Sequence, residues 1–169
     1  EEVGRVTGGR AVLHHRELTY SIICSAENSF FPRNVLGTYK IIAGGLLAGF
    51  SHLGIKADMA ARPYRRISTV TNIPRDPSCF AVPSWYEIVA QGRKIVGSAQ
   101  RRVAGAFLQH GSILLNYDPA LEAEVIRGGG AGAGAVTSIE ELLGRPVSCA
   151  EVKEAFLKGF SQAFGVLFN

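Results

Sequence analysis

The sequence predicts an α+β fold in which a mixed or antiparallel sheet carries flanking helices and a helical C-terminal end. Three observations support this prediction: one long segment with a helical apolar rhythm, a central strand-rich region with a glycine turn, and helix-capping patterns in the last third. The 169 residues predict a single domain over residues 1–169. Apolar residues make up 47% and charged residues 19%, a balance typical of a chain that buries a core.

The N-terminal part predicts two short strands around a glycine turn at residues 7–10. The strand-like runs cover residues 11–13 and 18–23. The first strand-rich unit is therefore expected to end near Ile23.

Residues 35–53 predict the clearest helix, because apolar side chains recur every three to four positions. Asn34 is expected to cap its start, and Gly54 to end it in the left-handed conformation with Ile55 folding back. The glycines at positions 44, 45 and 49 weaken the helix, so we expect them to let a sheet approach closely.

The middle of the chain predicts a loop followed by strands. Residues 57–82 are polar and rich in proline, which favours a loop with one strand near residues 67–70. Residues 85–90 and 94–99 flank Gln91-Gly92-Arg93 and predict a hairpin. Further strands are expected at residues 103–108 and 112–115.

The C-terminal third is predicted to be helical. Pro119 is expected to open a helix that runs to about Ile126. Residues 128–135 form a Gly/Ala linker. Ser138 and Ser148 each begin a capping-box pattern, and the second starts a helix with one apolar face. That face consists of Val152, Ala155, Phe156, Gly159, Phe160, Ala163 and Phe164.

Composition excludes several classes of function. Three cysteines in no Cys-x-x-Cys spacing argue against a disulfide framework and a zinc site, so we expect no metal and a reducing, cytoplasmic location. The net charge of +4 is scattered, which argues against nucleic acid and fits an acidic protein partner. No apolar run approaches the roughly 20 residues of a membrane span, and no signal peptide is visible.

Cys79 and Lys94 are the leading candidates for chemistry. Cys79 lies in a Pro-punctuated loop shortly before the hairpin that carries Lys94, and an ammonium near a thiol stabilises the nucleophilic thiolate. Acyl transfer through a thioester is therefore the reaction to test first. Each residue also has an ordinary interpretation, because a lone cysteine is most often a small buried hydrophobe and a lysine beside a turn is usually solvated.

Other candidates carry weaker signals. Gly8 and Gly9 form either a simple tight turn or a place where backbone amides approach a ligand. His14, His15 and His110 are possible ligands or bases, of which His110 is the best placed, and a Cys79/His110 dyad is an alternative. The Gly-x-Gly-x-x-Ala pattern in the linker follows a helix, so it does not predict a dinucleotide site.

Several motifs in order resemble a known superfamily. Residues 5–21, with Arg5-Val6-Thr7-Gly8-Gly9-Arg10, resemble the Arg-Arg-x-Thr-Gly-Gly-Arg motif of the lipoate/biotin protein ligase and octanoyltransferase superfamily. Residues 79–100, with Cys79-Phe80, Gly92-Arg93-Lys94 and Gly97-Ser98-Ala99-Gln100, resemble the cysteine-dependent octanoyltransferases of the Gram-positive type. Residues 108–115 complete the resemblance.

The resemblance implies a lipoate/biotin protein ligase-type fold and an octanoyltransferase of lipoate biosynthesis. Octanoyl–acyl carrier protein is the implied donor, Cys79 the thioester carrier and Lys94 the residue that lowers the pKa of the thiol. The implied acceptor is a lysine of a lipoyl domain such as the glycine cleavage H protein, and no cofactor is implied. The residues expected to line the acyl pocket are Arg5, Gly8, Gly9, Arg10, Ser98, Ala99, Gln109, His110, Gly111 and Ser112.

The sequence departs from the pattern at two positions and leaves rival functions open. Gly4 stands where the family usually has arginine, and Val6 where proline is common. We also expect the chain to lack the N-terminal segment that normally precedes this motif. The rival functions are an ATP-dependent lipoate–protein ligase, which needs no cysteine, and a non-catalytic module that binds carrier proteins.

Overall fold

The computed structural model describes residues 12–60, 87–126 and 134–168. Two three-stranded antiparallel sheets and a pair of long helices make up most of this part. One sheet has the order β1-β6-β5, from β1 (Glu17–Ser25), β5 (Val96–Val103) and β6 (Ala106–Leu114). The other has the order β2-β3-β4, from β2 (Asp58–Met59), β3 (Ile88–Ala90) and β4 (Arg93–Lys94).

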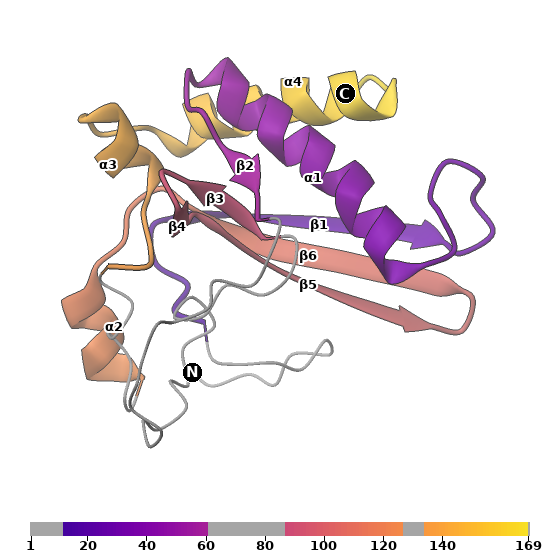
Figure 1. Ribbon diagram of the computed structural model, residues 1–169, viewed down its shortest axis with the longest axis horizontal. Helices are drawn as coiled ribbons and strands as arrows, with labels where there is room; N and C mark the ends of the chain where they lie inside the picture. Colours follow the sequence, from indigo (N-terminus) through magenta and orange to yellow (C-terminus); the bar gives the residue numbers. More distant parts are fainter. Residues whose placement is uncertain (1–11, 61–86, 127–133, 169) are drawn as a thin grey trace.

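Four helices are described: α1 (Val35–His52), α2 (Pro119–Val125), α3 (Ile139–Leu143) and α4 (Cys149–Phe164). Helices α1 and α4 lie side by side over one face of the larger sheet (Figure 1). The predicted α+β class is therefore confirmed, with antiparallel strand pairing in both sheets.

The predicted helix ends are confirmed. The Asn34 side chain accepts a hydrogen bond from the Gly37 amide at the start of α1. At its end Gly54 has a φ of +75°, and the Ile55 amide donates to the Phe50 carbonyl at 2.9 Å. Ser138 and Ser148 cap α3 and α4, each through its hydroxyl oxygen. Local side-chain chemistry is thus sufficient to place these boundaries.

The expectation that glycines in α1 admit a sheet is wrong, because a helix occupies that place. A Cβ at Gly159 of α4 would lie 2.3 Å from the Gly49 nitrogen and 2.6 Å from the Gly45 oxygen. Rings of α4 lie over the same two positions, since a Cβ at Gly45 would meet Phe160 and one at Gly49 would meet Phe156. Gly44 faces open space.

The strand predictions are partly confirmed. β1 and the hairpin β3–β4 appear where strands were expected, and α2 follows Pro119. The bounds of the next strands were predicted wrongly: β5 continues to Val103, a turn follows at Ala104 and Gly105, and the two strands expected at residues 103–108 and 112–115 form the single strand β6. Val12 and Leu13, predicted as the end of a strand, have no regular structure, and β2 lies in the predicted loop. The predicted strand at residues 67–70 and most of the 128–135 linker lie outside the described residues.

The core lies between the larger sheet and the helix pair. Ile42, Leu46 and Phe50 of α1 are buried together with Phe156 of α4 and Ile113 of β6. Burial of a side chain of this size stabilises a fold by about 1.5–3 kcal/mol. The sheet is therefore supported firmly on the face that carries the helices.

Candidate functional site

Lys94 is completely buried and bonded to a buried carboxylate. Its Nζ donates to Glu87 Oε1 at 2.6 Å, and Glu87 is itself only 5% exposed. The two residues are brought together by the β3–β4 hairpin, in which Val89 pairs with Lys94 and Ala90 with Arg93. Gln91 and Gly92 form the turn with positive φ angles of 51° and 74°, as a two-residue hairpin requires.

The backbone of Lys94 is held on its other side by the segment before α3. The Lys94 amide donates to the Ala135 carbonyl at 2.8 Å, and the Thr137 amide donates to the Lys94 carbonyl at 2.9 Å. Val136 thereby forms a parallel bridge with Lys94. The end of the predicted linker is thus part of the site, and it fixes the position of Lys94.

Burying the ammonium of Lys94 costs desolvation free energy. Removing two charges from water costs several kcal/mol each, which their mutual attraction only partly offsets. A buried, paired ionisable group is for this reason a candidate for a functional site. The ordinary interpretation of Lys94 as a solvated lysine beside a turn is therefore wrong, and Glu87 forms an ion pair with it.

The two faces of the larger sheet divide the predicted pocket residues. Residues paired across antiparallel strands share a face, and neighbours along a strand alternate. His110 pairs with Ala99, and Ser112 pairs with Gly97. These residues lie on the face away from the helices, because their neighbours along β6, Gln109, Gly111 and Ile113, belong to the helix side.

Ser98 and Gln109 belong to a polar network on the helix side. The Tyr20 hydroxyl lies 2.7 Å from Ser98 Oγ, and Gln109 Nε2 donates to Tyr20 Oη at 3.2 Å. Gln100 Nε2 in turn donates to Gln109 Oε1 at 2.9 Å. Burial raises the pKa of Tyr20, and the hydrogen bonds with Gln109 and Ser98 oppose this shift. These side chains therefore pack on the helix side of the sheet, whereas His110 lies on the opposite face.

Gly111 is required by close packing within the sheet. A Cβ at this position would lie 2.4 Å from the Gly97 carbonyl oxygen and 2.8 Å from Tyr20 Cε1. Any side chain there would push β5 away or displace the tyrosine. The structure therefore explains this glycine by packing between β5, β6 and Tyr20, and its role beside an acyl group stays a prediction.

The remaining predicted site residues lie outside the described part of the chain. They are Cys79, Arg5, Gly8, Gly9 and Arg10. The distance from the Cys79 thiol to the Lys94 ammonium accordingly stays a prediction, as does the Cys79/His110 dyad. His14 and His15 lie just before β1, and both are exposed.

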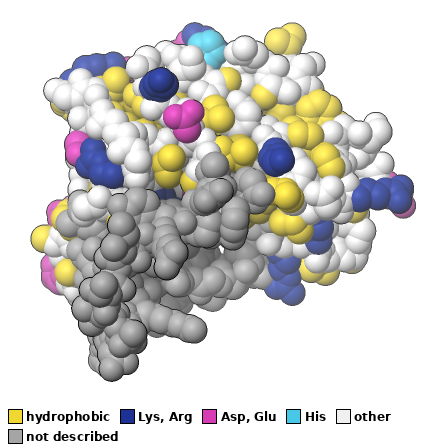
Figure 2. Space-filling view, in the orientation of Figure 1, with side chains coloured by type: hydrophobic (Ala, Val, Ile, Leu, Met, Phe, Trp, Pro, Cys, Tyr) yellow, Lys and Arg dark blue, Asp and Glu magenta, His cyan; other side chains and the backbone are white. Residues whose placement is uncertain are grey.

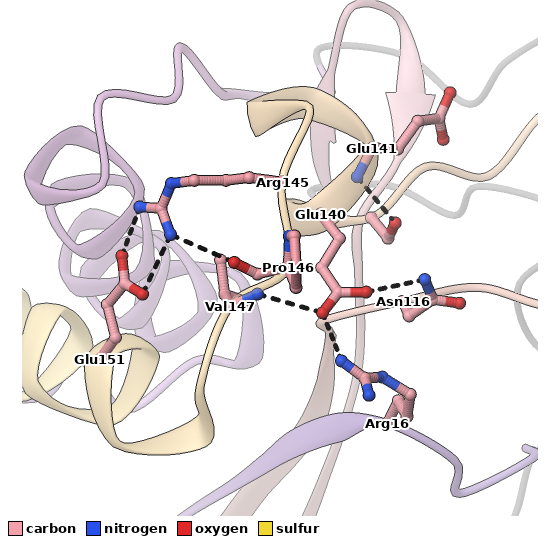
Figure 3. A network of polar contacts seen from close by, with 9 residues as sticks. Arg16, Asn116, Glu140, Glu141, Arg145, Pro146, Val147 and Glu151 are labelled. Atoms are coloured by element: carbon pink, nitrogen blue, oxygen red, sulfur yellow. Dashed lines mark hydrogen bonds and ion pairs between the residues drawn. The ribbon is translucent and has the colours of Figure 1, made fainter.

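A carboxylate on α3 anchors the end of the sheet nearest to Lys94. Glu140 accepts hydrogen bonds from the Arg16 guanidinium, from the Val147 amide at 3.1 Å and from Asn116 Nδ2 at 2.8 Å (Figure 3). The hydrogen bond from the Val147 amide, with those from Asn116 and Arg16, lowers the pKa of Glu140. This anchor ties the start of β1 and the end of β6 to α3.

Sequence reasoning missed Glu87 and Tyr20. Glu87 stands among apolar and aromatic residues, in Trp85-Tyr86-Glu87-Ile88-Val89, and a lone carboxylate in such a run is a signal of a buried acid. Tyr20 carries no comparable signal, because an isolated tyrosine in a strand is ordinary.

Three properties of the described residues concern basic surface charge, membrane spans and metal binding. Lys and Arg side chains are spread over the face drawn in Figure 2 and form no continuous stripe there. Within the described ranges, no helix combines the length and apolar character needed to cross a bilayer. In the same ranges, no three side chains of the usual ligand types are grouped to hold a metal ion.

Curated relatives are similar over almost the whole chain. Octanoyltransferase LipM of Brevibacillus brevis is 43% identical, over 97% of this chain and 63% of the relative. Octanoyltransferase LipM of Bacillus subtilis is 39% identical, over 97% of this chain and 62% of the relative. The chain thus spans less than two thirds of the length of these relatives.

Solved structures show the same fold at lower identity. A lipoate-protein ligase A bound with ATP matches with a TM-score of 0.71 and 23% identity, over 98% of this chain and 59% of that structure. Biotin protein ligase from Aquifex aeolicus matches with a TM-score of 0.55 and 14% identity, over 89% of this chain and 53% of that structure. The family model described as "Lipoyl protein ligase A/B catalytic domain" matches residues 1–161. The chain therefore belongs to the lipoyl protein ligase A/B catalytic domain family.

Proposed function

We propose that this protein transfers an octanoyl group from the thioester of an acyl carrier protein to a lysine of a lipoyl domain. The glycine cleavage H protein is the proposed acceptor. The observation that carries the proposal is the 43% identity, over 97% of the chain, to a relative named as an octanoyltransferase. The presence of Cys79 favours the transferase over a ligase, because a thioester donor is already activated and needs no ATP.

The proposed first step is thioester exchange on Cys79. The thiolate attacks the donor's carbonyl carbon, a bond from Sγ to that carbon forms, and the bond to the carrier's sulfur breaks. The carrier leaves as a thiolate and takes up a proton. The neutral acceptor amine then attacks the same carbon, the bond from that carbon to Cys79 Sγ breaks with its electron pair on sulfur, and a proton passes from nitrogen to the Cys79 thiolate as the amide forms. Atoms and charges balance without a cofactor.

Lys94 is proposed to stabilise both charged species. In its buried position the field of the ammonium is weakly screened, so it lowers the pKa of a thiol placed beside it. Glu87 Oε1 accepts a hydrogen bond from this ammonium and holds it in place. The ammonium held in this way is suited to hydrogen bond a carbonyl oxygen that becomes negative in the transition state.

The acyl chain is proposed to lie along the sheet face that carries Ala99, His110 and Ser112. Ser98, Gln109 and Gly111 support this face from the helix side. The glycine- and arginine-rich segment with Arg5, Gly8, Gly9 and Arg10 is proposed to close the pocket. Burial of an octanoyl tail at ~0.8 kcal/mol per CH₂ supplies roughly 5 kcal/mol of binding free energy.

Intact mass spectrometry after mixing with octanoyl–acyl carrier protein tests the proposal. We expect an octanoyl adduct on the wild-type protein that hydroxylamine removes, and none on Cys79→Ala. Cys149→Ser is the matched control, because Cys149 is an exposed thiol at the start of α4. Lys94→Met is expected to form the adduct at least 100-fold more slowly, the range typical of a lost electrostatic group. If no adduct forms and modification of a lipoyl domain requires ATP, the protein is a ligase. If the protein binds the acyl carrier protein but neither forms an adduct nor modifies a lipoyl domain, it is a non-catalytic module.

A further inference from the structure

Strand β1 forms one edge of the larger sheet, and among the described strands it pairs only with β6 (Figure 1). Arg16 and Ala26, which flank β1, form backbone hydrogen bonds with the residues just after and just before β6. Because the direction of hydrogen bonding alternates along an antiparallel strand, the even-numbered residues of β1 bond to β6. The backbone groups of Thr19, Ser21 and Ile23 therefore point outward along an open edge.

The open edge of β1 is suited to accept a further strand. The strand is nine residues long and contains no proline or lysine, and its only charged residue is Glu17 at the start. Its register with β6 is continuous, without a bulge. Proteins usually protect a long edge strand with charges, proline, a bulge or a covering segment. The residues of β1 supply none of the first three devices, which leaves a covering segment.

An apolar groove of about 490 Å³ lies beside this edge, between β1 and α4. The helix-side residues of β1 form one wall, and the apolar face of α4 forms the other. Tyr20 and Phe160 meet between the two walls, with ring centroids 6.0 Å apart. Among the described residues that line the groove, Lys153 alone carries a charge. The groove is therefore suited to apolar side chains with one acidic group at the Lys153 end.

Several large apolar side chains of this groove are exposed to solvent. Ile23 is 74% exposed, Leu157 is 37% exposed, and Val166 and Phe168 near the C-terminal end are 45% and 47% exposed. Isolated apolar residues are common on protein surfaces, but a cluster of them around one groove marks a surface that another molecule covers. The open edge and the exposed groove are adjacent, so one polypeptide segment can cover both.

The curated relatives contain additional polypeptide that is available for this role. The match is 63% of the Brevibacillus brevis relative and 62% of the Bacillus subtilis relative, so more than a third of each lies outside it. The match covers 97% of this chain in both cases, so that polypeptide is additional to the elements described here. We propose that the corresponding part of the full protein adds a strand to the open edge of β1 and covers the groove.

The surface specifies the chemistry of this segment. Alternate side chains of a strand added to β1 lie on the groove side of the sheet, so these positions must be apolar. The side chains between them lie beside Thr19 and Ser21 on the opposite face. A carboxylate is expected where the segment passes Lys153. The segment is thus an extended strand with apolar residues at every second position, bound through backbone hydrogen bonds as in strand addition to a sheet edge.

Residue-resolved hydrogen exchange tests the added strand. The protein alone is compared with a chimera in which the unmatched part of the Brevibacillus brevis relative is joined to it in the order of that relative. We expect the amides of Thr19, Ser21 and Ile23 to exchange at least about 100-fold more slowly in the chimera, because each gains a hydrogen-bond partner. The amides of Tyr20 and Ile22 already bond to β6, so their protection in both proteins shows that the sheet is folded. The same comparison is made with the unmatched part supplied as a separate polypeptide.

Two variants with matched controls locate the contact. Ser21→Pro removes one outward amide and no bond to β6, so in the chimera exchange at Thr19 and Ile23 should become about tenfold to 100-fold faster. Ser21→Ala keeps the amide and should behave as the parent chimera. Leu157→Glu places a charge in the groove and should also raise exchange at these two amides. Val125→Glu, which changes an exposed apolar residue of α2, is its control.

Three results would overturn the proposal. The first is fast exchange at Thr19, Ser21 and Ile23 both in the protein alone and with the added polypeptide. The second is protection that appears in the protein alone as its concentration rises, because a second copy then occupies the edge. The third is protection that neither Ser21→Pro nor Leu157→Glu reduces. None of these results depends on octanoyl transfer, so this proposal and the proposed function fail separately.

Discussion

Replacing Gly159 by alanine is expected to destabilise the protein through the contact between α1 and α4. The new Cβ would lie 2.3 Å from the Gly49 nitrogen, 2.6 Å from the Gly45 oxygen and 2.8 Å from the Gly49 Cα. Ordinary contact of a Cβ begins at about 3.4 Å, so the helices must separate by about 1 Å. All three neighbours are backbone atoms, so no side-chain rotation relieves the clash.

The magnitude follows from two opposing effects. Overpacking of a close-packed interior costs about 1–3 kcal/mol, and a backbone clash belongs at the upper end. Alanine in a helix interior returns about 0.8–1 kcal/mol relative to glycine. The net loss is therefore about 2 kcal/mol of unfolding free energy. For a chain of this size that loss lowers Tm by about 4–8 °C.

Gly44→Ala is the matched control, because it lies in the same helix pair and a Cβ there meets nothing within 4 Å. This variant receives the helix-propensity gain without the clash, so its unfolding free energy should rise by up to ~1 kcal/mol. Urea unfolding followed by circular dichroism measures both variants. A Gly159→Ala protein as stable as Gly44→Ala would refute the packing argument.

Two further predictions concern charged groups. Glu87→Ala leaves the ammonium of Lys94 buried without this carboxylate, and the unfolding free energy in urea should fall by about 3–5 kcal/mol; a loss below 1 kcal/mol would mean that the pair contributes little. The lowered pKa of Glu140 means that its contribution is present above the ordinary carboxyl pKa and is lost as pH falls through the folded value. Thermal unfolding between pH 7 and pH 3 should therefore show a smaller acid-induced fall in Tm for Glu140→Gln than for the wild type, and equal slopes would contradict this reasoning.

The helical layer could be predicted in detail because its signals are local. The caps at Asn34 and Ser148 depend on residues three positions away, and the buried face of α4 depends on a spacing within one helix. What lies against the glycines of α1 is a different kind of question. Nothing in residues 44–49 distinguishes an approaching helix from an approaching sheet, since both need the same absence of side chains. That answer lay in Gly159, more than 100 residues away in the sequence.

The division of the predicted pocket residues shows a second limit of sequence reasoning. Ser98 and Ala99 belong to one motif, and so do Gln109 and His110, yet each pair sends its side chains to opposite faces of the sheet. A motif specifies which residues occur together, whereas the pleat decides which of them face a ligand. The strand register together with the buried core identifies the face that packs on the helices.

The buried pair of Glu87 and Lys94 shows how much depends on a single residue of register. The sequence predicts a turn over residues 91–93, which would pair Ala90 with Lys94 and place Glu87 on the opposite face from the lysine. The observed two-residue turn pairs Val89 with Lys94 instead. Glu87 is two residues before Val89, so its side chain falls on the same face as Lys94. A slip of one residue would leave the ammonium without this carboxylate, and the buried site for Lys94 therefore depends on Gln91 and Gly92 adopting their left-handed turn.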